Sequence, residues 1–340
     1  MTNSYIEQLA TRREIETEKL KKRAGKCSRL ILSLGIMSIL LNLAAVVFLK
    51  IFLFFGSNVN GVLKLMDRDY INVFFGMLPC MIIDLVVIYT GTKATKINLK
   101  NILKMNIKEK KITGLATMSI GGVLFISTLL NGIYMLITEG VNLKTPSPDF
   151  SFPKLAIPAI MYVVYVCLIG PILEELIFRG IILHYMKPYG KITAMIFSSI
   201  LFTMFHLNLI QFMTPLLLGL VLSFVVIKTE SIKSSIIMHI FNNTMATLLS
   251  LLSSVNIKSY GVNISIYGIV VSIYMIFGIA SLALFVMRYK DDVRSMIEEE
   301  IHFSSLIKKV SYCFCNLWSE AYIAFYIVII LVNFVAYNIK

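Results

Sequence analysis

Three apolar segments of this chain each carry a pair of side chains spaced four residues apart. The pairs are Glu175 with Arg179, Phe202 with His206, and His239 with Asn243. Residues four apart lie on the same face of a helix, so both members of a pair point in one direction. Ionisable and amide groups are costly in a membrane and usually face a bundle interior, which makes them candidates for a functional site.

A further carboxylate, Glu174, lies about 100° around a helix from Glu175. Arg179 is therefore placed to neutralise Glu175 rather than Glu174. A carboxylate without a cationic partner suits general-base chemistry, histidine transfers protons near neutral pH, and an asparagine amide can donate to an oxyanion. Together these groups predict activation of water against an amide. Taken singly, each histidine could be a packing residue, and Asn242 and Asn243 could join helices by hydrogen bonds.

The composition is that of a membrane protein. The mean hydropathy is +0.81 and 57% of the residues are apolar, both above the values of soluble domains. The net charge of +13 does not predict a nucleic-acid partner, because the basic residues gather at the ends of apolar runs. The five cysteines indicate neither a disulfide framework nor a metal cluster.

Nine apolar runs predict an all-α fold, a polytopic transmembrane helical bundle of about eight or nine spans. They cover about 30–55, 71–90, 112–137, 157–186, 192–207, 215–227, 235–252, 264–287 and 321–337. Basic residues concentrate before the first run and after the second. This asymmetry predicts a multi-pass protein of the cell membrane with a cytosolic N-terminus.

The same pattern divides the chain into four parts. They are a basic cytosolic tail (1–29), N-terminal membrane helices (30–154), a catalytic core (155–252), and C-terminal membrane helices with a charged cytosolic segment (253–340). The fourth run would form a helix of ~45 Å, longer than a ~30 Å hydrocarbon core. Gly170 and Pro171 predict a break in it one turn before Glu174, because proline lacks a backbone N–H.

Three short motifs follow one another within the predicted core. They are EELIFR (174–179), FTMFH (202–206) and HIFNN (239–243). In this order they resemble the EExxxR, FxxxH and HxxxN motifs of the CPBP intramembrane protease family, the CAAX-processing and bacteriocin-processing group also called Abi. The resemblance covers about residues 155–250, and the flanking helices carry no motif of the family.

The resemblance implies a role for each motif residue. Glu174 and His206 would activate the attacking water, and His239 and Asn243 would stabilise the tetrahedral oxyanion. Glu175 and Arg179, with Phe202, would shape the site. The pattern favours glutamate catalysis without a cofactor, since no His-Glu-x-x-His sequence is present. The alternative is a zinc site that draws Glu174, His206 and His239 from separate helices.

The implied function is an intramembrane endopeptidase that acts on a membrane-associated peptide or protein. CAAX-type processing, maturation of a peptide pheromone and bacteriocin immunity all remain open. Two other classes are a proton-coupled transporter, although the EExxxR segment is not repeated, and a non-catalytic protein that binds or sequesters a peptide. Asp84 in the second run and His184 near the end of the fourth are not assigned to catalysis.

Overall fold

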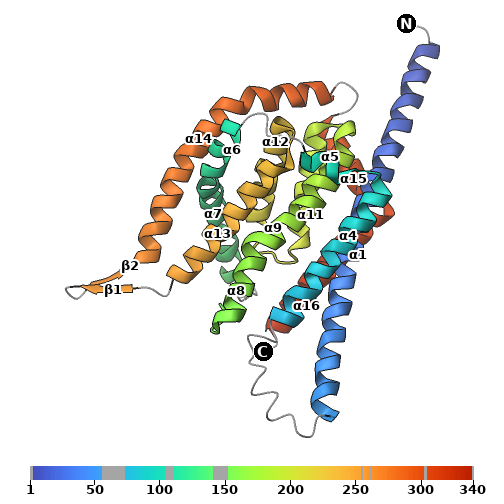
Figure 1. Ribbon diagram of the computed structural model, residues 1–340. Helices are drawn as coiled ribbons and strands as arrows, with labels where there is room; N and C mark the ends of the chain where they lie inside the picture. The colour runs from blue at the N-terminus through green and yellow to red at the C-terminus, as the bar shows by residue number, and fades with distance from the viewer. Residues whose placement is uncertain are drawn as a thin grey trace.

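The computed structural model describes residues 3–55, 73–104, 110–140, 152–253, 256–259, 262–301 and 305–338. The segments 56–70 and 145–149, which separate predicted apolar runs and which we expect to be loops, lie outside these residues. Within them, the chain is a bundle of helices with long members on both sides of a shorter, buried set (Figure 1).

The elements follow the apolar runs. The first part of the chain forms α1 (Asn3–Phe55), the π-helical turn η1 (Val73–Met77), α4 (Leu78–Thr95), α5 (Leu99–Lys104), α6 (Lys110–Met118) and α7 (Ile120–Gly140). The central part forms α8 (Ala156–Val164), η2 (Tyr165–Ile169), α9 (Gly170–Glu175), η3 (Leu176–Leu183), α10 (His184–Met186), η4 (Lys187–Tyr189), α11 (Lys191–Phe205), α12 (Met213–Thr229) and α13 (Ile232–Leu252). The last part forms β1 (Asn256–Ser259), β2 (Val262–Ser265), α14 (Ile266–Ile301), α15 (Leu306–Phe314) and α16 (Leu317–Asn338).

The predicted all-α polytopic bundle is confirmed. Among the described residues, seven helical stretches are long and apolar enough to cross a membrane, and α11 and α12 are shorter apolar helices. The chain is thus a multi-pass membrane protein. One feature departs from the helical pattern: β1 and β2 form a short antiparallel hairpin at the junction between the apolar runs predicted at 235–252 and 264–287.

The first helix is longer than the sequence pattern suggested. Helix α1 continues without a break through the boundary predicted at residue 29, and at 1.5 Å per residue it is about 80 Å long. Leu20, Ala24 and Cys27, within the predicted tail, are buried against the bundle. The Arg23 guanidinium donates to the backbone oxygen of Tyr185 at 2.7 Å, which joins this part of α1 to the end of the fourth run.

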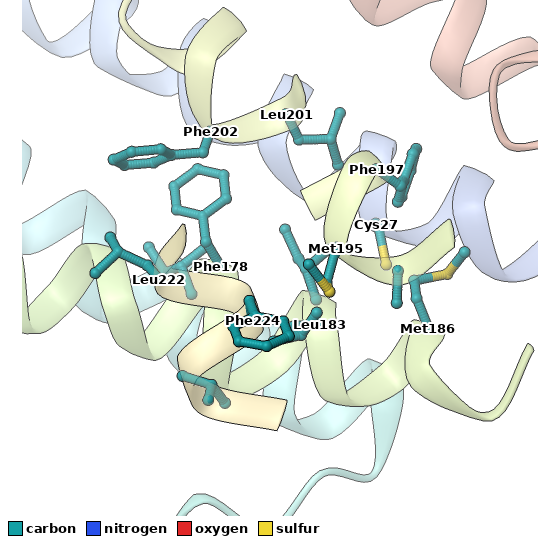
Figure 2. Packing of buried hydrophobic residues seen from close by; sticks show 14 of the residues in the cluster. Cys27, Phe178, Leu183, Met186, Met195, Phe197, Leu201, Phe202, Leu222 and Phe224 are labelled. Atoms are coloured by element: carbon teal, nitrogen blue, oxygen red, sulfur yellow. The ribbon is translucent and has the colours of Figure 1, made fainter. Parts of the chain in front are cut away.

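The core of the bundle lies around α11 and α12, which pack against each other and against η3. Phe178, Phe197 and Phe202 are fully buried there, and their rings fill the space between the helices (Figure 2). Helices α1, α4 and α16 lie together on one side, and α7 and α14 pack on the other (Figure 1). The apolar residues of these outer helices are largely exposed, as expected of surfaces that face lipid.

Candidate active site

The helix that carries the two glutamates changes its hydrogen-bond pattern twice around them. Before Gly170 it is the π-helix η2, in which the Gly170 N–H donates to the oxygen of Tyr165, five residues back. The next carbonyl in this pattern, that of Val166, would take its bond from residue 171. Pro171 has no N–H, so the chain itself leaves the Val166 oxygen without a helical donor. The break predicted at Gly170 and Pro171 is therefore a shift in hydrogen bonding within a continuous helix.

Asn243 of α13 supplies the missing donor. Its side-chain Nδ2 donates to the Val166 oxygen at 2.9 Å, and its Oδ1 accepts from Asn242 Nδ2 at 3.0 Å. The amide of Asn243 is thus held in a fixed orientation by the helix that carries the glutamates. One of its two N–H groups remains for another acceptor. Sequence reasoning did not assign Asn242 to the site, although its position beside Asn243 was a usable signal.

Glu175 and Arg179 form the ion pair that their spacing predicted. Arg179 Nη1 donates to Glu175 Oε1 at 2.9 Å, and both side chains are 0% exposed. Such a pair persists in a low dielectric only when further hydrogen bonds offset the cost of removing it from water. Arg179 Nη2 donates to the oxygen of Gly219 at 3.1 Å, and His239 Nδ1 lies 3.0 Å from Glu175 Oε1. Glu175 thereby joins α9 to α13 as well as to its own helix.

Gly219 of α12 makes room for the guanidinium. A Cβ atom at this position would lie 3.0 Å from Arg179 Nη2 and 3.1 Å from the Cβ of Ser199. Both neighbours are fully buried, so neither can move aside into solvent. Sequence reasoning missed Gly219, because a glycine in an apolar helix gives no sign of what packs against it.

Glu174 differs from Glu175 in exposure and in having no ion pair with Arg179. Its side chain is 21% exposed, and its Oε2 lies 3.7 Å from His239 Nε2, beyond the length of a direct hydrogen bond. Because Glu175 is a carboxylate, His239 Nδ1 serves as the donor to it. In the neutral ring Nε2 is then the basic nitrogen, and it faces Glu174. Glu174 is therefore the accessible carboxylate of the pair, with an imidazole rather than a guanidinium beside it.

Phe202 holds the two histidines and the arginine together. Its ring centroid is 4.9 Å from that of His206 and 5.7 Å from that of His239, both edge to face. The Arg179 guanidinium lies over the same ring at 4.5 Å, an arrangement that stabilises a buried cation. The three motifs thus meet at one phenyl ring, which explains why a phenylalanine accompanies the histidine.

His206 has its tautomer set by its own helix. Its Nδ1 lies 2.9 Å from the backbone oxygen of Phe202, and a carbonyl only accepts, so Nδ1 carries the proton. Nε2 is then the nitrogen that can accept a proton in the neutral ring. His206 interacts electrostatically with Glu174 and with His239, so all three titratable groups lie in one region.

Asp84 also belongs to this region, although the sequence reasoning set it aside. It lies on α4, is 5% exposed, and interacts electrostatically with Glu174. Asp84 thus adds a third carboxylate near the two glutamates, and only Glu175 among the three is paired with Arg179. An aspartate inside a spanning helix was itself a signal of function. His184 takes no part in this cluster, because its Nδ1 is 2.6 Å from the backbone oxygen of Arg179.

The zinc alternative requires Glu174, His206 and His239 as joint ligands. In the part of the chain that the structure describes, no three His, Cys, Asp or Glu side chains come together in a way that could hold a metal ion. His239 uses Nδ1 for Glu175, and its Nε2 faces the Glu174 carboxylate. Among the described residues these three side chains are not arranged as joint ligands of one zinc ion, so the chemistry is derived from side chains alone.

Comparison with known families agrees with the three motifs. Residues 156–245 match the family described as Rce1-like, type II CAAX prenyl endopeptidase Rce1-like. This confirms the resemblance to CAAX-processing membrane proteases over the segment that carries all seven predicted site residues. Neither the curated proteins nor the solved structures gave a match.

Proposed function

We propose that the Rce1-like segment makes this protein an intramembrane endopeptidase, with Glu174 as the base that activates water. The observation that carries the proposal is the difference between the two adjacent glutamates. Glu175 is buried and bonded to Arg179 and His239, whereas Glu174 is partly exposed and lies beside an imidazole. Of the two side chains, only Glu174 is exposed enough to contact a water molecule.

The chemistry follows from these contacts. Glu174 takes a proton from water as the water oxygen attacks the peptide carbonyl carbon, and His206 Nε2 orients that water as an acceptor. The C–O bond forms and the carbonyl oxygen becomes an oxyanion. The proton on Glu174 then passes to the leaving nitrogen, the C–N bond breaks, and the base is restored.

Two donors are available for the oxyanion. Asn243 has one N–H left after its bond to Val166, and fixed donors of this kind need no reorganisation during the reaction. His239 Nε2 donates when the ring carries both protons, a form whose charge the Glu175 carboxylate balances. Glu175, Arg179 and Phe202 act as positioning residues, because they hold His239 and touch no reacting atom.

The substrate class follows from the surroundings of the site. The cluster lies inside a bundle whose outer faces are apolar, so the substrate is a peptide or protein that is itself associated with the membrane. With the N-terminus in the cytosol, Glu174 lies in the half of the bilayer nearer the cytosol. CAAX-type processing is the form of this activity that the family description names.

The test compares membrane-anchored peptides from cells that carry the wild-type protein or Glu174→Gln, by mass spectrometry. Gln keeps the size of the side chain and removes the base, so cleavage should fall by roughly 10²–10⁴-fold at equal protein abundance. Glu298→Gln, which removes an exposed carboxylate far along the chain, is the matched control. A chelator should leave cleavage unchanged.

The outcomes separate the three classes of function. A peptide that accumulates uncut only with Glu174→Gln would identify both the activity and the substrate. An unchanged peptide profile, with both variants equally abundant, would overturn the proposal. Loss of cleavage with chelator that Zn²⁺ restores would favour the zinc alternative instead.

A further inference from the structure

A cavity lies at one end of the bundle, lined by α1, η4, α11, α14 and α15. Its volume is about 820 Å³. It shares no lining residue with the cluster around Glu174, and most of its walls lie outside the segment that matches the Rce1-like family. The parts of the chain without a recognised motif therefore build a site of their own.

The lining is rich in cations. Six basic side chains face this cavity from four elements: Arg12, Arg13, Lys187, Lys191, Lys308 and Lys309. The acidic residues of the lining are Glu16, Glu299 and Glu300. The cations thus outnumber the carboxylates two to one, which gives the cavity a positive potential.

Each of the three carboxylates already has a partner. Glu16 accepts from Lys19 at 2.9 Å, and Glu299 accepts from Lys191 at 2.8 Å. Glu300 accepts from the backbone N–H groups of Ile192 and Thr193 at 2.8 and 3.1 Å, so it occupies the N-terminus of α11. A ligand would therefore bind to the side-chain cations and not to the end of that helix.

Four cations of the lining are left for a ligand. Lys191 is paired with Glu299, and Lys309 Nζ donates to the backbone oxygen of Glu300 at 2.6 Å. Arg12, Arg13, Lys187 and Lys308 form no ion pair among the residues that the structure describes. Two arginines beside two lysines suit phosphate, because a guanidinium binds two of its oxygens at once.

The floor and one wall of the cavity are apolar. Leu20 and Met296 are buried beneath it, and Tyr189 forms part of its side. Arg23 lies over the Tyr189 ring at 4.8 Å and is bonded to the Tyr185 oxygen, which holds this wall in place. Cationic groups above an apolar floor match a ligand that has a phosphate and an apolar portion.

We infer that this cavity binds a phosphate-bearing ligand, with the phosphate at Arg12, Arg13, Lys187 and Lys308. The helices α1 and α14 run from the spanning region to the cavity, so it lies on the face of the bundle that the basic residues predict to be cytosolic. Basic pockets at that level of a membrane bind the head groups of anionic lipids. A free phosphate compound from the cytosol would present the same chemistry.

The experiment uses the full chain and two probes. Native mass spectrometry measures retention of phosphatidylglycerol by protein taken from nanodiscs of phosphatidylglycerol and phosphatidylcholine, and inorganic phosphate is titrated separately. The pocket variant is Lys187→Gln with Lys308→Gln. The control variant is Lys22→Gln with Lys26→Gln, which removes the same charge from exposed lysines of α1 that do not line the cavity.

The expected result is roughly 30-fold weaker retention of the probe by the pocket variant, at about fivefold for each of the two cations removed. The control variant should stay within about twofold of wild type. Retained lipid that inorganic phosphate displaces would identify a head group as the source. Binding of inorganic phosphate without lipid retention, lost in the pocket variant alone, would identify a free phosphate compound.

Two results would overturn the inference. One is retention of both probes by the pocket variant at the wild-type level. The other is an equal loss in the pocket and control variants, which would show general attraction to a basic surface. Thermal unfolding of each variant without ligand checks that it is folded, and Lys308→Gln alone, at an exposed position, serves if the pair is unstable.

Discussion

Two arginine–glutamate pairs in this chain have the same spacing and opposite surroundings. Glu175 and Arg179 are 2.9 Å apart and fully buried, whereas Arg294 and Glu298 are 3.0 Å apart and mostly exposed. Both satisfy the four-residue rule for side chains on one helix face. Only the first is bonded to other helices, through Gly219 on α12 and His239 on α13.

The difference shows what the buried pair does for the protein. An exposed pair contributes little, because water competes for both charges. Burying a pair costs free energy because both charges leave water. That cost is offset only when every charged group finds hydrogen-bond partners inside the protein. The Glu175–Arg179 pair therefore fixes the relative positions of three helices, and this positions His239 beside Glu174. The exposed pair positions nothing beyond its own helix.

The strongest test of this comparison is Arg179→Met against Arg294→Met. Removing Arg179 leaves the Glu175 carboxylate buried without its cation, so we expect a loss of about 3–5 kcal/mol in unfolding free energy. Arg294→Met should cost less than about 0.5 kcal/mol. Thermal unfolding in detergent, followed by circular dichroism, measures both.

A third variant sharpens the result. Glu175→Gln with Arg179→Met removes both charges, so it should recover part of the stability that Arg179→Met loses. It should still reduce cleavage, because His239 loses the carboxylate that balances the charge of its doubly protonated ring. If Arg179→Met and Arg294→Met lost equal stability, burial of the Glu175–Arg179 pair would not distinguish it from the exposed Arg294–Glu298 pair.

A smaller effect is expected from Gly219→Ala. The added methyl would press on Arg179 and Ser199 inside the core, where overpacking costs about 1–3 kcal/mol. Gly114→Ala on α6 is the matched control, because a Cβ there meets nothing within 4 Å and alanine favours a helix. The same unfolding measurement applies. If Gly219→Ala were as stable as Gly114→Ala, the close packing of the Arg179 guanidinium against Gly219 would be contradicted.

The smallest effect concerns Asn243 and the carbonyl that Pro171 leaves without a donor. Asn243→Ala should cost about 1 kcal/mol, the usual range for a hydrogen bond between membrane helices. In a Pro171→Ala background the helix regains its own N–H, so the same substitution should cost less. Unfolding of the two single variants and the double variant gives the coupling free energy. Additive losses would mean that Asn243 does not replace the proline's missing donor.

Much of the fold could be predicted from the chain alone. The apolar runs gave the helices because a membrane span must be long and apolar, a constraint that leaves a clear pattern in the sequence. The continuity of α1 through residue 29 could not be predicted in the same way, since charged residues there form helix as readily as a solvated segment. The burial of Leu20 and Cys27 depends on what lies beside them.

The candidate site likewise has features that the sequence predicts and features that only the packing of helices explains. Spacing determined that Glu175 and Arg179 would pair and that Glu174 would stand apart from them, since both follow from the geometry of one helix. Asp84 remained unassigned because its neighbour Glu174 is 90 residues away in the chain and on another helix. Gly219 acts through its contact with Arg179 on another helix, which no local pattern reports, whereas Asn242 bonds to its chain neighbour Asn243.

The sequence by itself determined where the apolar helices form and which polar groups lie within them. It also showed that the motifs of these groups resemble those of a protease family. The tertiary structure alone decided which nitrogen of His239 faces which glutamate, which carbonyl Asn243 bonds to, and where the cation-lined cavity opens. The physical reason is that helix formation is local, whereas a buried polar group must find its partners wherever packing brings them. In this chain those partners come from α9, η3, α12 and α13 at once.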